Sequence, residues 1–160
     1  MNRLALRYVE RYATSRKKLA GYLQRKIRER EWQDDAPPAV EELVERFAAL
    51  GYIDDALYAQ SKASSLTRRG YGMRRVSHAL YQAGISEADG REAFQISEEN
   101  KWAAADKFAR KRKIGPYAED QQEAEKCRKQ LQAFLRAGHD FDVASRFVFA
   151  KPGEEILAED

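Results

Sequence analysis

The sequence predicts an all-α protein built as a tandem array of three three-helix repeats. Helix formers dominate the 160 residues, whereas helix breakers are few, with 4 Pro and 9 Gly. Apolar residues recur at the i, i+3, i+4 spacing of amphipathic helices along most of the chain. Helix-stop signals return about every 50 residues, a period typical of a short solenoid.

The predicted first repeat covers residues 1–53. An apolar stripe runs from Leu4 to Tyr12, and Ser15 is placed to cap a second helix that carries its own stripe. Two prolines in segment 33–38 end that helix. A third helix is expected from about residue 40 to 50, because its apolar side faces a row of glutamates. Gly51 is placed to end it.

The predicted second repeat covers residues 54–97. Asp54 or Asp55 is expected to cap a helix over about 56–69, which the Gly70–Gly72 stretch interrupts. A second helix over 73–83 follows, and Gly84 ends it. Ser86 and Asp89 have the spacing of a capping box that opens a short acidic helix to about residue 96.

The predicted third repeat covers residues 98–150, and an acidic tail over 151–160 is expected to fray. Its first helix ends in a basic run before Gly115-Pro116, and a long helix then ends at Gly138. Asp140 is expected to cap the last helix. The helix stop at 136–140 parallels the one at 82–86, and this parallel is the clearest sign of the repeat.

Charge alternates in blocks along the chain. Residues 1–33 hold ten basic and three acidic residues, 34–55 hold one and seven, and 56–86 hold five and none. The alternation continues to the end of the chain and leaves a formal net charge of +3. It predicts repeats that present one basic and one acidic face. Solvated helices with complementary charges inside the molecule would give the same pattern.

A search for catalytic and metal-binding patterns finds none that is complete, so the sequence predicts a protein that is not an enzyme and holds no cofactor or metal. Gly70-Tyr71-Gly72 lacks the preceding strand and third glycine of a dinucleotide-binding loop. Asp34-Asp35 is best explained as a loop and Asp54-Asp55 as a cap. Cys127 lies on an apolar stripe and is expected in the core. His139 is expected at the surface, and His78 on a helix surface, where a phosphate contact is the alternative.

The rest of the composition predicts a cytoplasmic protein. One cysteine cannot form an intramolecular disulfide, and no stretch reaches the roughly 18 apolar residues of a membrane span. The N-terminus is charged and amphipathic, unlike a signal peptide. With catalysis not indicated, the sequence predicts a binding function. Arginine pairs on both sides of a glycine turn are suited to bind phosphates or an acidic protein surface. Tyr71 at that turn either stacks on a base or partner or closes the turn against the core.

Residues 51–85 resemble the signature of the RecX family, bacterial regulators of the RecA recombinase. The resemblance is carried in order and spacing by Gly51-Tyr52-Ile53-Asp54-Asp55, Tyr58-Ala59, Arg69-Gly70-Tyr71-Gly72, Arg75-Val76, Leu80 and Ala83-Gly84-Ile85. It is strong in this centre and weaker in the first and third repeats.

The resemblance implies an elongated, curved array of three-helix repeats that acts as a monomer. It implies binding to the RecA filament on single-stranded DNA, with inhibition of RecA ATPase, strand exchange and coprotease activity. Recombination, DNA repair and the SOS response would thereby be restrained. Direct binding of single-stranded or double-stranded DNA is left open, and no membrane association is expected.

The basic residues and the turn tyrosine are the predicted contacts to RecA and DNA. They are Lys62, Arg68, Arg69, Tyr71, Arg74 and Arg75, with Arg16, Lys17, Lys18, Arg110, Lys111, Arg112 and Lys113 as outer contributors. Two alternatives stay open, a helical nucleic-acid-binding module and a protein adaptor, each acting independently of RecA.

Overall fold

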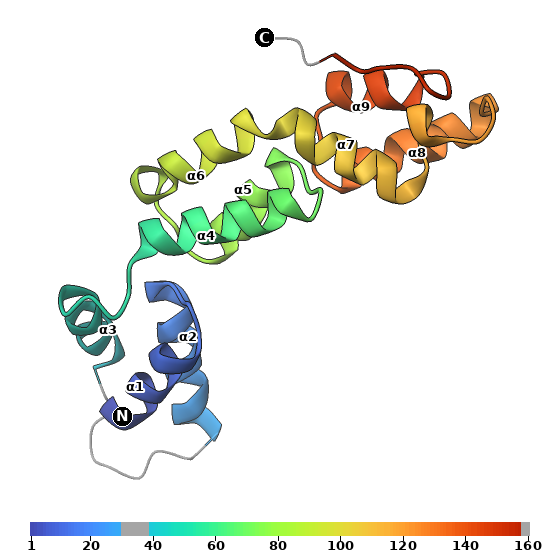
Figure 1. Ribbon diagram of the computed structural model, residues 1–160. Helices are drawn as coiled ribbons and strands as arrows, with labels where there is room; N and C mark the ends of the chain where they lie inside the picture. Colours follow the sequence, from blue (N-terminus) through green and yellow to red (C-terminus); the bar gives the residue numbers. More distant parts are fainter. Residues whose placement is uncertain (30–38, 158–160) are drawn as a thin grey trace. The chain divides into compact units, whose positions relative to one another are not determined.

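The computed structural model describes residues 1–29 and 39–157. Every regular element in these two ranges is helical, as predicted (Figure 1). The helices are α1 (Asn2–Arg11), α2 (Arg16–Glu29), α3 (Val40–Ala49), α4 (Asp55–Arg68), α5 (Met73–Gln82), α6 (Glu87–Glu99), α7 (Lys101–Arg112), the short 3-10 helix η1 (Gly115–Tyr117), α8 (Ala124–Arg136) and α9 (Phe141–Val148). The prolines in segment 33–38 and the Asp34-Asp35 pair lie outside the described residues.

The chain forms two compact units. Unit 1 comprises Met1–Ala59 with Leu80–Gly90, and unit 2 comprises Gln60–Ala79 with Arg91–Asp160. The division passes through α4, α5 and α6, so each unit combines residues of neighbouring predicted repeats. The repeat boundaries 1–53, 54–97 and 98–150 therefore stay a prediction.

The core of unit 1 is built by α1, α2 and α3. Most of the buried residues lie on the predicted stripes, with Leu19 and Leu23 of α2 and Phe47 of α3 among them. Tyr12 and Leu50, at the ends of two predicted stripes, are exposed instead. Ser15 caps α2 as predicted, because its Oγ accepts a hydrogen bond of 3.3 Å from the N–H of Lys18. Gly51 follows α3 with a φ of +78°, a conformation that suits glycine at a helix end.

The two aspartates at the start of α4 have different roles. Asp54 is the cap, since its Oδ1 accepts a 2.8 Å hydrogen bond from the N–H of Leu57. Asp55 is buried, and its carboxylate accepts a 2.9 Å bond from the N–H of Arg16 and lies 3.3 Å from the Arg16 guanidinium. The prediction of one cap within this pair is correct, but capping does not explain Asp55.

The core of unit 2 lies between α7, α8, α9 and η1. Phe134 of α8 is fully buried, with Phe108 of α7 edge-on at 4.6 Å and Phe147 of α9 stacked at 5.9 Å between ring centroids. Cys127 is buried in this core, as predicted. Residues 151–157 follow α9 without a helix, yet Ile156 packs against the core and the N–H of Gly153 bonds the Pro116 carbonyl. Residues 151–155 and Leu157 are exposed, and the fraying expected of the tail stays a prediction.

Candidate interaction surface at the Gly70 to Gly72 turn

The turn between α4 and α5 sets the positions of the central arginines. After α4 ends at Arg68, the N–H groups of Gly70 and Tyr71 bond the carbonyls of Thr67 and Leu66, at 2.9 and 3.1 Å. Gly70 takes a φ of +88°, which an L side chain rarely adopts. The turn therefore places Arg68 and Arg69 just before it and Arg74 and Arg75 just after it, and all four are exposed.

This turn packs backbone to backbone against the turn between α8 and α9. The N–H of Gly72 donates to the Ala137 carbonyl at 3.0 Å, and the N–H of Arg74 donates to the Gly138 carbonyl at 3.1 Å. A Cβ on Gly72 would lie 2.4 Å from the Gly138 oxygen, and a Cβ on Gly138 would lie 2.4 Å from the Arg75 nitrogen. Two glycines are needed at this contact, and their close approach fixes the turn that carries the arginines.

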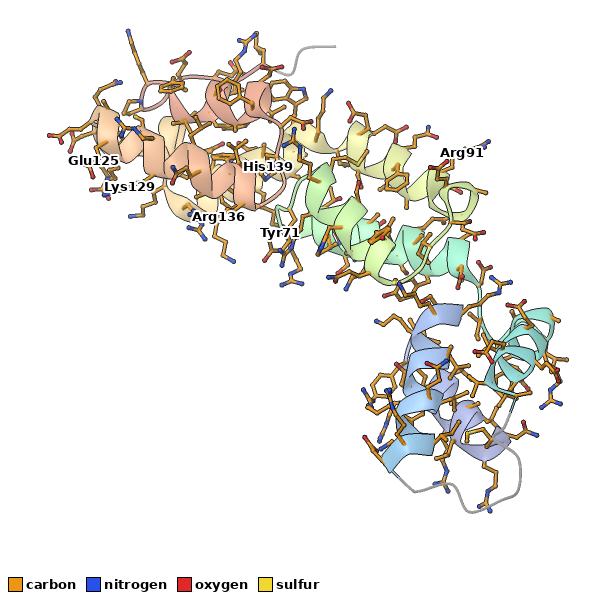
Figure 2. All side chains as sticks on the ribbon, turned by 180° about the vertical axis from the view of Figure 1, so that it is seen from behind. Tyr71, Arg91, Glu125, Lys129, Arg136 and His139 are labelled. Carbon is orange, nitrogen blue, oxygen red and sulfur yellow. The ribbon has the colours of Figure 1, made fainter. Side chains whose placement is uncertain are left out.

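His139 joins the same contact from beneath, and the prediction that it lies at the surface is wrong. Its side chain is buried, and its Nε2 lies 2.9 Å from the Gly70 carbonyl oxygen (Figure 2). The ring also packs against Phe108 and Phe134. Burial lowers the pKa of His139, so the ring is neutral near pH 7 and Nε2–H donates to the carbonyl. A position just past a helix end is usually exposed, whereas the Gly70 turn, 69 residues away, and the Phe108 and Phe134 rings bury this one.

Tyr71 supports two of the arginines. Its ring is half-buried against the core of unit 2, and the guanidinium carbons of Arg69 and Arg75 lie 5.3 and 5.5 Å from the ring centroid. Such contacts orient a guanidinium and stabilise it by about 0.5–1 kcal/mol at an exposed site. Of the two interpretations of Tyr71, packing against the core is confirmed, and stacking on a base or partner stays a prediction.

The charge at the start of α5 is opposite to what helix stability favours. The first turn of α5 has Arg74 and Arg75 and no acidic residue. The N-terminus of a helix carries partial positive charge, so a cation there is unfavourable by an amount on the order of 0.3–1 kcal/mol. Arg74 is partly neutralised by Asp140, at 3.4 Å, although both side chains are exposed. Asp140 precedes α9 but makes no side-chain capping bond, contrary to prediction, because it faces Arg74 instead.

The same kind of contact occurs in unit 1, between the α1–α2 turn and the α5–α6 turn. The Ser15 hydroxyl donates to the Ala83 carbonyl at 2.6 Å, as the Gly72 N–H donates to the Ala137 carbonyl in unit 2. Lys17 and Lys18 follow Ser15 by the spacing at which Arg74 and Arg75 follow Gly72. The first turn of α2 likewise has no acidic residue. A basic pair at the start of the second helix is thus a repeated feature.

Two other predicted contact residues, Arg16 and Lys62, do not belong to the arginine cluster at the turn. Arg16 is held by Asp55 and by Glu45 at 3.4 Å, so it acts as a structural cation. Lys62 is half-buried in the middle of α4, about two turns before Arg69. The structure does not group it with the arginines of the turn.

The basic run at the end of α7 is partly satisfied by its own neighbours. Arg110 pairs with Asp106 at 3.4 Å and donates to the Tyr117 hydroxyl at 2.9 Å, and Lys113 pairs with Glu119 at 3.2 Å. Arg112 lies 5.1 Å above the Phe108 ring, and Lys111 is exposed. Cations at a helix C-terminus are also favoured by the helix dipole, so local stability explains much of this run.

Arg136 belongs to the surface although the sequence reasoning did not select it. It is exposed in the last turn of α8, directly before Ala137, whose carbonyl accepts the Gly72 N–H (Figure 2). The parallel between segments 82–86 and 136–140 could have pointed to Arg136, because it places this residue at a helix stop of the repeat.

Residues 1–29 and 39–157 contain no group of three His, Cys, Asp or Glu side chains placed to bind a metal ion. No helix within these two ranges has the length and apolar character needed to cross a bilayer. The fold and the surface define an all-helical repeat protein that presents an exposed arginine cluster on a rigid turn.

Comparison with known proteins gives the family. A family model described as the second three-helix domain of RecX matches residues 54–93. The regulatory protein RecX of Agrobacterium fabrum is 32% identical over 97% of this chain and 86% of its own length. That of Myxococcus xanthus is 31% identical over 92% of this chain and 83% of its own. The chain therefore belongs to the RecX family of regulatory proteins.

Solved structures support the fold. The crystal structure of RecX from Lactobacillus salivarius superposes with a TM-score of 0.60 and 21% identity, over 90% of this chain and 89% of that one. A crystal structure of a regulatory protein RecX superposes with a TM-score of 0.61 and 23% identity, over 89% of this chain and 66% of that one.

Proposed function

We propose that this protein binds the filament that RecA forms on single-stranded DNA and inhibits RecA. The inhibited activities would be ATP hydrolysis, strand exchange and coprotease action, so that recombination and the SOS response are restrained. Membership in a family of regulatory proteins supports this proposal. The observation that carries it is the arginine cluster at the Gly70–Gly72 turn, whose backbone is fixed by the α8–α9 turn.

A nucleoprotein filament offers both kinds of anion that arginine recognises. Guanidinium groups bind phosphates and carboxylates through paired, charge-assisted hydrogen bonds. Arg68, Arg69 and Arg75 have exposed guanidinium groups close to one turn, and Tyr71 holds two of them. Because hydrogen bonds already fix the backbone of the turn, binding has to order the arginine side chains but not the turn itself.

The outer contributors are expected to contribute less to binding than the arginines of the Gly70–Gly72 turn. Lys17 and Lys18 repeat the position of the central basic pair in unit 1. Lys62, Lys111 and Arg112 add positive charge in unit 2 and steer association. Arg16, Arg110 and Lys113 are paired with acidic neighbours and are expected to contribute least to binding.

The test is RecA ATPase on single-stranded DNA with this protein added below and up to the RecA concentration. We expect ATP hydrolysis to fall as the protein is added. Unchanged RecA activity together with salt-dependent DNA binding would favour a nucleic-acid-binding module, and an effect on neither would favour an adaptor for another partner.

A further inference from the structure

The last helix, α9, has a second apolar side that is open to solvent. Phe141 and Phe149 are 55% and 61% exposed, whereas Phe147 of the same helix is buried in the core of unit 2. Phe149 directly follows α9 and keeps helical backbone angles, with φ −95° and ψ −1°. Residues four apart share one side of a helix, so Phe141, Ser145 and Phe149 lie in one row.

This row lines a groove with a volume of about 570 Å³, to which Asp142, Arg146 and Glu154 also contribute. Ser145 forms its middle. The Ser145 hydroxyl donates to the Phe141 carbonyl at 2.7 Å, so its hydrogen-bonding group is already satisfied within the helix. A small residue between two large apolar ones leaves space into which side chains of another helix can fit.

The charges beside this row are complementary to themselves. Asp142 and Arg146 are both exposed, and they lie one turn apart with the acid before the base. In an antiparallel pair of identical helices the order along the second helix is reversed. The acid of each helix then lies beside the base of the other. Such reciprocal matching is what a two-fold symmetric contact between identical subunits requires.

We propose that this side of α9 is an interface between two copies of this protein. The two α9 helices cross antiparallel at Ser145. Phe141 of each copy packs beside Phe149 of the partner subunit, and Asp142 of each copy pairs with Arg146 of the partner subunit. This inference goes beyond the proposed function, and it departs from the monomer that the family resemblance implies.

The area of the contact sets the expected affinity. The exposed parts of the four phenylalanine side chains in a dimer amount to roughly 400 Å² of aromatic surface, if a whole side chain offers about 200 Å². A standard stable interface buries roughly 1,600 Å². Because α9 has only 8 residues, we expect a weak dimer with a dissociation constant on the order of 10–100 μM.

A second copy fits this surface better than a strongly charged partner does. An acidic or basic partner is matched by a surface of one sign, whereas Asp142 and Arg146 place both signs one turn apart. The arginine cluster of the Gly70–Gly72 turn belongs to the same unit as α9, so a dimer has two such clusters. Two linked sites bind a repetitive filament more tightly than one. This last consequence rests on the proposed function, whereas the interface itself does not.

Sedimentation equilibrium of the full chain, without RecA, tests the proposal over a concentration range of about 1 μM to 1 mM. Phe141→Ala tests the apolar contact. Its control is Tyr52→Ala, because Tyr52 is an aromatic residue of unit 1 with a similar exposure of 51%. Circular dichroism first establishes that every variant is folded.

The charges are tested by Asp142→Arg and Arg146→Asp, singly, combined in one chain, and as a mixture of the two single variants. Glu125→Arg and Lys129→Asp are the matched controls. Glu125 and Lys129 form another exposed pair four residues apart, on α8 of the same unit (Figure 2).

We expect a monomer–dimer equilibrium for the unchanged protein and for the three controls. Phe141→Ala raises the dissociation constant at least about tenfold, because the two-fold symmetry removes the ring from both sides of the contact. Asp142→Arg alone and Arg146→Asp alone place like charges opposite each other, so each variant stays monomeric. An equal mixture of these two variants dimerises again, because one variant then has two bases and the other two acids. The combined variant also dimerises.

Four results would overturn the proposal. An unchanged protein that stays monomeric up to about 1 mM would support the monomer that the resemblance implies. Dimers that no α9 variant weakens, or that the mixture does not restore, would place the interface elsewhere. Assemblies that keep growing beyond the dimer would contradict a two-fold contact. Loss of RecA inhibition by folded Phe141→Ala with an unchanged oligomeric state would assign the groove to RecA. Because sedimentation is measured without RecA, failure of the proposed RecA inhibition leaves the result interpretable.

Discussion

Gly72 and Gly138 meet with no room for a side chain on either, since a Cβ on Gly72 would lie 2.4 Å from the Gly138 carbonyl oxygen. Hydrogen bonds from Gly72 to Ala137 and from Arg74 to Gly138 close the same contact. The residues are 66 positions apart in the chain, so this contact joins the first turn of the predicted second repeat to the second turn of the third. The geometry of the arginine cluster depends on it.

Replacing Gly72 by alanine is expected to destabilise the protein by about 1–3 kcal/mol, the usual range for overpacking in a tight contact. The clashing atoms belong to backbone, which cannot rotate away as a flexible side chain would. Urea unfolding followed by circular dichroism measures the loss. Gly21→Ala is the matched control, and it should raise stability by about 0.5–1 kcal/mol because its Cβ has open space. Equal stabilities of the two variants would contradict the described contact.

His139 makes stability depend on pH. Burial lowers its pKa in the folded state below the ordinary 6.5, so the unfolded chain takes up a proton first as the pH falls. The contribution of a neutral His139 is therefore complete above about pH 6.5 and is lost as the pH falls from there through the lowered pKa. We expect the free energy of unfolding to decrease between pH 7.5 and pH 5.5.

The assignment to this histidine is checked by substitution. His139→Gln should flatten the pH dependence in that interval, and it should also lower stability at pH 7.5 because the packed ring is lost. A pH dependence that survives His139→Gln unchanged would contradict the assignment.

Much of the fold could be predicted from the sequence because its signals are local. Helical periodicity and the capping pattern of Ser15 each concern residues within one or two turns, and the structure confirms them. Local patterns predict a cap at Asp54 or Asp55 and a surface position for His139, because those are the usual roles of such positions. Their actual partners, Arg16 and Gly70, lie 39 and 69 residues away, and no local pattern identifies such a contact.

The candidate site shows the same limit. The sequence places arginines on both sides of Gly70–Gly72, but it does not reveal that Tyr71 lies beside Arg69 and Arg75 or that Arg136 is near the turn. It also groups Arg16 with Lys17 and Lys18, whereas a buried aspartate holds Arg16 alone. Charge in a sequence gives the number of cations, and only packing decides which of them are available to a partner.

Asp55 stabilises unit 1 through its contact with Arg16. Asp55→Ala removes the acceptor of the Arg16 N–H and the partner of its guanidinium, so we expect a loss of about 1.5–3 kcal/mol, the range for hydrogen bonds to charged groups. Thermal and urea unfolding measure it. Glu125→Ala, which breaks an exposed pair with Lys129 at 2.7 Å, should change stability by less than about 0.5 kcal/mol. Similar losses in the two variants would show that Asp55 acts only as a surface charge.

Tyr71 is expected to act on function through the arginines that it orients. Tyr71→Phe keeps the aromatic face and should inhibit RecA ATPase like the unchanged protein. Tyr71→Ala releases Arg69 and Arg75 and removes a ring that packs on the core. It should raise the concentration needed for half-inhibition several-fold, since each cation–π contact is worth about 0.5–1 kcal/mol. Full inhibition by a folded Tyr71→Ala variant would show that Tyr71 has no role in RecA inhibition.

The central claim is that the arginines of the Gly70–Gly72 turn bind the RecA filament, and charge reversal tests it most directly. One variant changes Arg68, Arg69, Arg74 and Arg75 to Glu. Its matched control makes the same change in net charge at four exposed cations elsewhere in unit 2, Lys107, Lys126, Arg128 and Lys129. Circular dichroism first establishes that both variants are folded.

RecA ATPase on single-stranded DNA is then measured with each variant at equal concentration. The proposed function predicts that the turn variant no longer inhibits RecA while the control still does. Full inhibition by the folded turn variant would contradict the claim. Equal loss of inhibition in both variants would also contradict it, because net charge and not the position of the arginines would then explain the loss.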